Sequence, residues 1–138
     1  MIELTFEYWN KLAEQTITIS SLLGGFSIAV IANFLVSDLN TKLSKSIMAV
    51  STLAASFFLI TIFAMTNILM KTTVGYPFKV VDNDLMLPRV VGVIAFFIGI
   101  ISLVALISMS GWTKSKKMGR FTTILGTITL LLILLMIT

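Results

Sequence analysis

Four long apolar runs dominate the pattern of hydrophobic and polar positions, and none of them contains a Lys, Arg, Asp or Glu. Each run is about 18 residues or longer, and at about 1.5 Å per residue a helix of that length can cross the core of a bilayer. We therefore predict an all-α integral membrane protein with four transmembrane helices, forming a single domain over residues 1–138. The predicted spans are residues 16–36, 47–70, 90–110 and 121–138.

The segment before the first span, residues 1–15, is amphipathic. Phe6, Trp9 and Leu12 recur at helical spacing, with acidic and basic residues between them. We predict a helical extension that continues into the first span. Two interpretations stay open: the extension anchors the chain at the membrane interface, or it prolongs a central pore helix into the cytosol.

The first and fourth spans differ in the size of their side chains. The first is rich in Ser, Gly and Ala, which let helix backbones approach closely in lipid, and it holds one strongly polar side chain, Asn33, near its end. The fourth ends in residues 130–137, which are all bulky and apolar and suit contact with lipid. We predict a central first helix and a peripheral fourth helix. The third span repeats small residues as a packing stripe at Gly92, Ala95, Gly99 and Ser102.

Three residues near the span ends have predicted structural roles. Asn67, late in the second span, is expected to hydrogen-bond a neighbouring helix. Asp84 is expected to cap the third helix, with Pro88 early in that helix.

Basic residues in the connections bear on the orientation in the membrane. Four spans place both termini on the same side of the membrane. The connections on the opposite side hold six basic residues, and the segments on the side of the termini hold four. Since basic residues favour the cytoplasmic side, this count favours termini outside the cell. The six are Lys42, Lys45, Lys114, Lys116, Lys117 and Arg120, and the four are Lys11, Lys71, Lys79 and Arg89.

The composition agrees with the membrane class and narrows the chemistry. The chain is 57% hydrophobic, with a mean hydropathy of +1.05. It contains no Cys and no His, so we expect no metal site, no cofactor and no enzymatic activity. All six carboxylates lie outside the spans, unlike the membrane-embedded Glu of small multidrug exporters. The net charge of +4 is expected to reflect topology and anionic head groups, with no nucleic-acid partner.

Residues 20–29, with the sequence SSLLGGFSIA, resemble the first transmembrane helix of the Orai calcium-channel family, where a Ser-x-Leu-Leu-Ser-Gly-Phe-Ala motif opens the pore helix. Residues 59–69 of the second span look like that family's second helix, and their end, residues 66–69, is similar to the family's Ser-Thr-Cys-Ile-Leu. The resemblance covers about the first half of the chain. It implies a hexamer in which six copies of the first helix surround a pore. The pore-lining residues that it implies are Thr18, Leu22, Gly25 or Phe26, Ala29 and Asn33.

The sequence departs from the family at the selectivity constriction. Asn33 stands where the family has a ring of Glu, and a neutral amide ring is not expected to select calcium strongly. No helix follows the fourth span to receive the family's STIM activator, so we expect no STIM-type activator. The family has its termini in the cytosol, which is opposite to the orientation that the basic residues favour.

Two functions remain open from the sequence. The first is an oligomeric, cation-permeable channel of the plasma (inner) membrane, with a constriction at Asn33 and an apolar gate at Leu22 and Phe26. Its expected partners are membrane lipids, permeant cations and further copies of the chain. The alternative is a non-conducting membrane partner, such as an accessory subunit, an immunity protein or an assembly factor. In that case Asn33 only hydrogen-bonds a neighbouring helix.

Overall fold

The computed structural model describes residues 5–36 and 41–137, and in this part of the chain all regular structure is helical. Four helices are long and apolar enough to cross a membrane, which confirms the predicted all-α fold and the four spans. Two short 3-10 turns precede and follow the third of these helices. The elements are α1 (Phe6–Val36), α2 (Lys42–Thr72), η1 (Asp82–Leu85), α3 (Met86–Ser110), η2 (Gly111–Thr113) and α4 (Lys116–Ile137).

The helices extend beyond the apolar runs that predicted them. α1 is continuous from Phe6, so the described part of the amphipathic extension is helical and joins the first span without a break, as predicted. α2 begins at Lys42, where the Oγ1 atom of Thr41 accepts a hydrogen bond from the Ser44 N–H at 3.1 Å. This is an N-cap, which satisfies one of the free donors of the first turn. The predicted span includes only uncharged residues, so it stops at the first charged residue. The helix itself continues past that residue to its cap.

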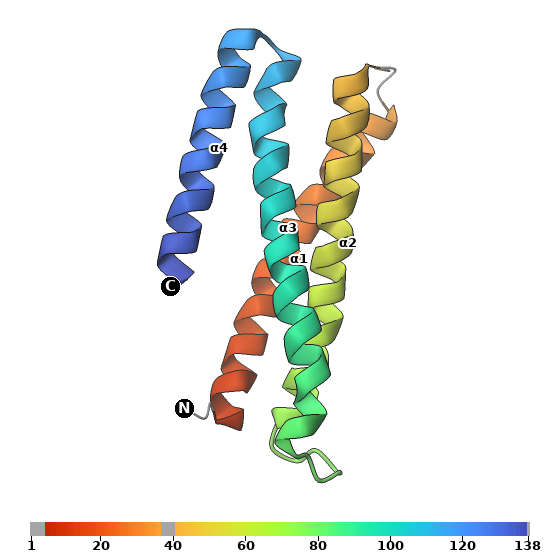
Figure 1. Ribbon diagram of the computed structural model, residues 1–138. Helices are drawn as coiled ribbons and strands as arrows, with labels where there is room; N and C mark the ends of the chain where they lie inside the picture. The colour runs from red at the N-terminus through yellow and green to blue at the C-terminus, as the bar shows by residue number, and fades with distance from the viewer. Residues whose placement is uncertain (1–4, 37–40, 138) are drawn as a thin grey trace.

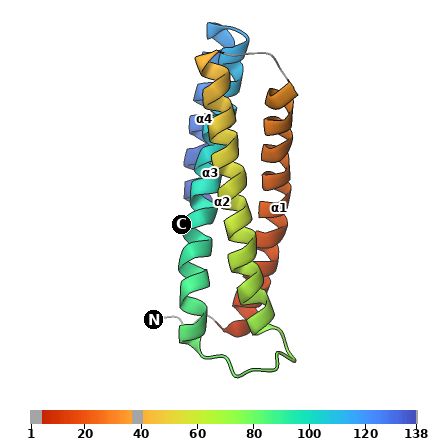
Figure 2. The same ribbon diagram turned by 90° about the vertical axis from the view of Figure 1, so that its right-hand side faces the viewer.

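The helices pack in the order in which they occur in the chain. α1 lies against α2, α2 against α3, and α4 against α3 and η2, whereas α1 and α3 meet only slightly. Figure 1 shows α3 and α4 as a hairpin, and Figure 2 shows α1 beyond α2 on the side away from α3. α2 and α3 are therefore the interior pair. Within one chain α1 is an edge helix, so a central first helix stays a prediction for an assembly of several copies.

The fourth helix is peripheral, as predicted. Its buried residues are Gly119 and Gly126, both on the side that meets η2 and α3. The bulky residues of its second half are mostly exposed; for example, Leu135 is 65% exposed. This surface suits contact with lipid chains.

Small residues bring α1 and α2 together. Ser20, Gly24 and Ser27 of α1 are buried, and a Cβ atom added to Gly24 would lie 3.3 Å from the Cβ atom of Phe58. The Ser27 hydroxyl donates to the Leu23 carbonyl of its own helix at 2.9 Å. A small side chain whose hydroxyl bonds its own backbone lets another helix approach closely without leaving a donor unpaired.

The packing stripe predicted on the third span is confirmed. Its four residues are all buried, and Gly99 lies directly under the ring of Phe58. That ring is fully buried and makes an edge-to-face contact with Phe96 at a centroid distance of 6.3 Å. Phe58 therefore packs between Gly24 of α1 and Gly99 of α3, and it links three helices. The stripe is Gly92, Ala95, Gly99 and Ser102.

The start of α3 differs from its prediction in one detail. Asp84 caps the 3-10 turn η1, because its Oδ2 atom accepts a hydrogen bond from the Val81 N–H at 3.0 Å. α3 itself begins at Met86 after Leu85, which has no capping side chain. Pro88 lies in the first turn of α3, as predicted, where its fixed φ suits the start of a helix.

Candidate pore face of α1

The residues that the Orai resemblance assigns to a pore all lie on one free face of α1. Every one of them is exposed in the chain, and the two large apolar members, Leu22 and Phe26, have 71% and 56% of their surface exposed. We call this set the outer face of α1. Its members are Thr18, Leu22, Gly25, Phe26, Ala29 and Asn33.

The outer face is opposite the surface with which α1 packs on α2. The buried residues of α1 are Ala13, Ser20, Gly24 and Ser27, spaced by three, four or seven positions. With 3.6 residues per turn, the outer-face residues centre on the other side of the helix. The structure therefore brings the six residues together on one surface, and within the described part of the chain no other helix covers that surface.

Asn33 supplies the amide of the outer face. It is exposed, lies one turn before the end of α1 at Val36, and makes no hydrogen bond with any residue that the structure describes. The Thr18 hydroxyl, in contrast, donates to the Glu14 carbonyl at 3.1 Å. Phe26 and Asn33 are seven residues apart, or about 10 Å along the axis. The apolar and polar parts of the face are thus separated by two helical turns.

A groove runs beside the outer face, between α1 and α2. Its volume is about 430 Å³ and it is open to the surroundings of the chain. Small residues such as Ser21, Gly25 and Ser56 form much of its wall, and a Cβ atom added to Gly25 would meet nothing within 4 Å. The groove is lined by Ser21, Gly24, Gly25, Ile28 and Ile31 of α1 and by Thr52, Ala55, Ser56, Leu59 and Ile62 of α2.

Sequence reasoning missed a polar cluster at the opposite end of α1. The Arg89 guanidinium stacks over the Trp9 ring at 4.5 Å and pairs with Asp82 through its Nη1 atom at 2.8 Å. Its Nε and Nη2 atoms are buried and have no hydrogen-bond partner in the described structure. The helical spacing of residues 1–15 places Trp9 on the apolar side of the extension and does not indicate a partner for it. Its contact partner is 80 residues away, and nothing local in the sequence signals that pairing.

Asn10 belongs to the same end and joins α1 to α2. Its Nδ2 atom lies 3.2 Å from the Leu69 carbonyl and 3.1 Å from the hydroxyl oxygens of both Thr72 and Thr73. Two N–H groups can satisfy two of these three acceptors at a time. Asn10 therefore helps to cap the end of α2, where backbone carbonyls lack partners within the helix.

With the residues that the structure describes, Asn67 does not make the interhelical hydrogen bond that was predicted for it. Its Oδ1 atom is buried and has no partner among the described residues. Asn10 makes such a contact in its place, since it reaches from α1 to the end of α2. Both are amides near helix ends, and the sequence alone does not distinguish them.

Comparison of the chain with models of known protein families, with curated proteins and with solved structures gives no match. The likeness to the Orai family therefore depends on the residues of the first two helices alone, and it stays a prediction.

Proposed function

We propose that the chain assembles into an oligomeric ion channel of the plasma (inner) membrane, with the outer face of α1 lining the pore. The observation that carries this proposal is the exposure of all six predicted pore residues on the free side of an edge helix. In a single chain that face carries the amide of Asn33 and still has no helix to cover it. In a ring of copies with α1 innermost, the outer face contacts either the water of the pore or the α1 helices of other copies.

The order of packing within one chain supports the same arrangement. With α1 at one edge and α4 at the other, a ring that has α1 at its centre has α4 at its rim. The exposed aliphatic surface of α4 then faces lipid, where it is most favourable. The Orai resemblance implies the same radial order and six copies, which we adopt as the proposed number.

The side chains of the outer face suggest how conduction is controlled. Leu22 and Phe26 form apolar rings that stop ions when the constriction loses its water. Asn33 forms a ring of amide oxygens about two turns further along. We propose cations as the permeant ions because these oxygens can replace part of a hydration shell. Without a carboxylate the ring concentrates divalent cations only weakly.

One observation favours the alternative, a non-conducting membrane partner. The groove between α1 and α2 has walls of small residues, and such surfaces are typical of helix packing in membranes. A transmembrane helix of another protein seated there makes this chain an accessory subunit. Flux measurements separate the two functions, because only the channel conducts by itself.

The test is ion flux into liposomes that contain purified protein, with the wild type beside Asn33→Ala and Asn33→Glu. We expect Asn33→Ala to change the conductance and Asn33→Glu to raise the ratio of divalent to monovalent cation flux. Ser46→Glu is the matched control, because it adds a carboxylate near the same end of the bundle on an exposed position of α2. Flux that does not respond to either change at Asn33, or no flux from folded protein, contradicts the proposed pore.

A further inference from the structure

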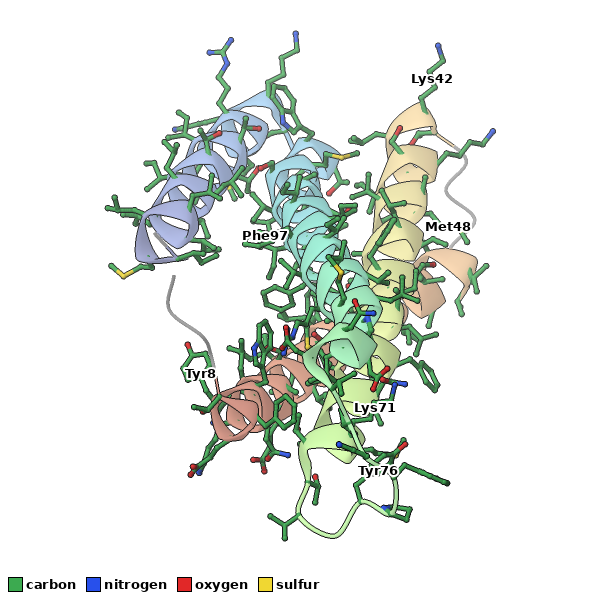
Figure 3. The ribbon with its side chains drawn as sticks, turned by 60° about the horizontal axis from the view of Figure 1, so that its bottom comes forward. Tyr8, Lys42, Met48, Lys71, Tyr76 and Phe97 are labelled. Carbon is green, nitrogen blue, oxygen red and sulfur yellow. The ribbon has the colours of Figure 1, made fainter. Side chains whose placement is uncertain are left out.

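The described charges are distributed very unequally between the two ends of the helix bundle. The start of α2 and the turn between α3 and α4 lie at the same end, where α2 also touches η2. We call the basic side chains there the basic end, and all of them are exposed. Figure 3 shows Lys42 and other nitrogen-tipped side chains pointing outward there. The basic end consists of Lys42, Lys45, Lys114, Lys116, Lys117 and Arg120.

No carboxylate of the described residues neutralises the basic end. The ion pair in the described structure, between Arg89 and Asp82, is at the opposite end. Asp38 falls in the connection between α1 and α2, outside the described residues. Even with Asp38 counted, six basic residues against one carboxylate leave an excess of five positive charges.

The opposite end is balanced. Four basic residues there face four described carboxylates, and two of the basic groups are already engaged. Arg89 is paired with Asp82, and the Lys71 Nζ atom lies 3.5 Å from the Asp84 carbonyl oxygen. The residues are Lys11, Lys71, Lys79 and Arg89 against Glu7, Glu14, Asp82 and Asp84.

Trp112 gives the depth of the basic end in the membrane. Its Nε1 atom donates to the Thr123 hydroxyl at 2.9 Å, and its ring fills the space that a Cβ atom on Gly119 would need. The ring of this η2 residue is thus fixed against α4 while 41% of the residue stays exposed. Tryptophan in such a position is typical of the head-group layer. A Trp112 in that layer puts the neighbouring basic side chains of residues 114–120 at the depth of lipid phosphates.

From these observations we infer that the basic end binds the head groups of anionic phospholipids, and that this end faces the leaflet rich in such lipids. Exposed ammonium and guanidinium groups without protein partners complement phosphate charge. One basic residue close to an anionic surface favours the association by roughly fivefold. The inference does not depend on ion conduction. It holds equally for a channel and for an accessory protein.

The two tryptophans make the test possible, because they lie at opposite ends of the bundle. Trp9→Phe leaves Trp112 as the only tryptophan, and Trp112→Phe leaves Trp9. Each variant is reconstituted in vesicles with brominated phosphatidylglycerol or with brominated phosphatidylcholine, since bromine quenches a nearby indole. From the quenching we expect phosphatidylglycerol to be preferred over phosphatidylcholine by roughly fivefold near Trp112. Near Trp9 we expect no preference. Raising NaCl to about 1 M, where the screening length is about 3 Å, should remove the preference.

Charge-removing variants identify the groups responsible. Replacing Lys114, Lys116 and Lys117 together by Gln should abolish most of the preference at Trp112. The matched control replaces Lys71 and Lys79 by Gln at the balanced end and should leave the preference unchanged. Equal quenching by both lipids at Trp112, or an equal preference at both tryptophans, overturns the inference. So does loss of the preference with inorganic phosphate but not with NaCl of equal ionic strength, because that result indicates a site for free anions.

A second measurement covers a tryptophan variant that does not fold. In nanodiscs, the unfolding temperature of the wild-type chain should be higher with phosphatidylglycerol than with phosphatidylcholine. The triple Lys→Gln variant should lose that difference. An identical unfolding temperature of the wild type in the two lipids contradicts the inference.

Discussion

The interface between α2 and α3 depends on a glycine, and Gly99→Ala tests this directly. A Cβ atom on Gly99 would lie 2.9 to 3.1 Å from three atoms of the Phe58 ring. Contacts this short are not tolerated, so either the ring or the helix has to move. Phe58 is fully buried and packs edge-on against Phe96, so the ring has little room. The substitution should therefore separate α2 from α3 locally.

The expected change in the free energy of unfolding combines two opposing effects. Overpacking a filled core costs about 1–3 kcal/mol. Replacing Gly by Ala inside a helix gains about 1 kcal/mol. We expect Gly99→Ala to lower the free energy of unfolding by about 0–2 kcal/mol, and to leave it about 1–3 kcal/mol below that of an alanine variant at an uncrowded helical glycine.

Two other helical glycines, one in α1 and one in α3, serve as controls. A Cβ atom on Gly25 of α1 would meet nothing within 4 Å, so Gly25→Ala should leave the stability of the single chain unchanged or raise it slightly. At Gly92 the Cβ atom would lie 2.6 Å from the Met65 Cε atom, which is the end of a flexible side chain and can move, and 3.2 Å from the Ala64 Cβ atom, which is tied to the α2 backbone. The free energy of unfolding of Gly92→Ala should therefore lie between those of the other two variants.

The assay is unfolding of each variant by SDS in mild detergent, followed by circular dichroism at the helix band. We expect Gly25→Ala to be the most stable of the three variants, Gly92→Ala to be intermediate and Gly99→Ala to be the least stable. If Gly99→Ala is as stable as Gly25→Ala, the close approach of α3 to Phe58 does not exist in the folded protein, and the packing described for the interior pair is refuted.

Two further predictions concern the ends of the bundle. Asn10→Ala removes an amide from the end of α2 and should lower the free energy of unfolding by about 1–2 kcal/mol in the same SDS assay, whereas the exposed Gln15→Ala should not. An unchanged stability of Asn10→Ala would mean that these hydrogen bonds do not hold α1 to α2. The chain has no Cys, so Val74→Cys and Ser115→Cys each introduce a single thiol, at the balanced end and at the basic end respectively. With the basic end in the cytoplasm, a membrane-impermeant maleimide added to intact cells should label only Val74→Cys, and labelling of only Ser115→Cys would reverse the orientation.

The spans were predictable because the bilayer imposes a simple rule. About 20 apolar residues without a charge are required to cross it, and four runs meet that condition. The stripe from Gly92 to Ser102 and the lipid-facing surface of α4 were predictable for a related reason. Side-chain size determines which helix faces can pack closely in lipid.

The position of α1 within the chain was not predictable by the same rule. α1 has small residues on two sides, with Ser20 and Gly24 on one and Ser21 and Gly25 on the other. Either side could accept α2, and composition does not choose between them. In the structure Ser20 and Gly24 face α2, so the outer face and the groove stay free.

Contacts between distant residues were also beyond the sequence pattern. The stacking of Arg89 on Trp9 requires α1 and α3 to converge at one end, and the bonding of Asn10 to α2 requires the same register. These are tertiary contacts, and neither hydropathy nor helical spacing carries information about them.

The central claim, that α1 lines a pore shared by several copies, is tested most directly by thiol modification during flux. Ala29→Cys introduces a thiol on the outer face of α1, and Leu132→Cys introduces one on the exposed surface of α4. Each variant is reconstituted in liposomes, and ion flux is recorded before and after a charged, water-soluble thiol reagent is added. The account predicts that the reagent reduces flux through Ala29→Cys and leaves Leu132→Cys unaffected. Flux through Ala29→Cys that the reagent does not change, although the thiol is shown to have reacted, would contradict it.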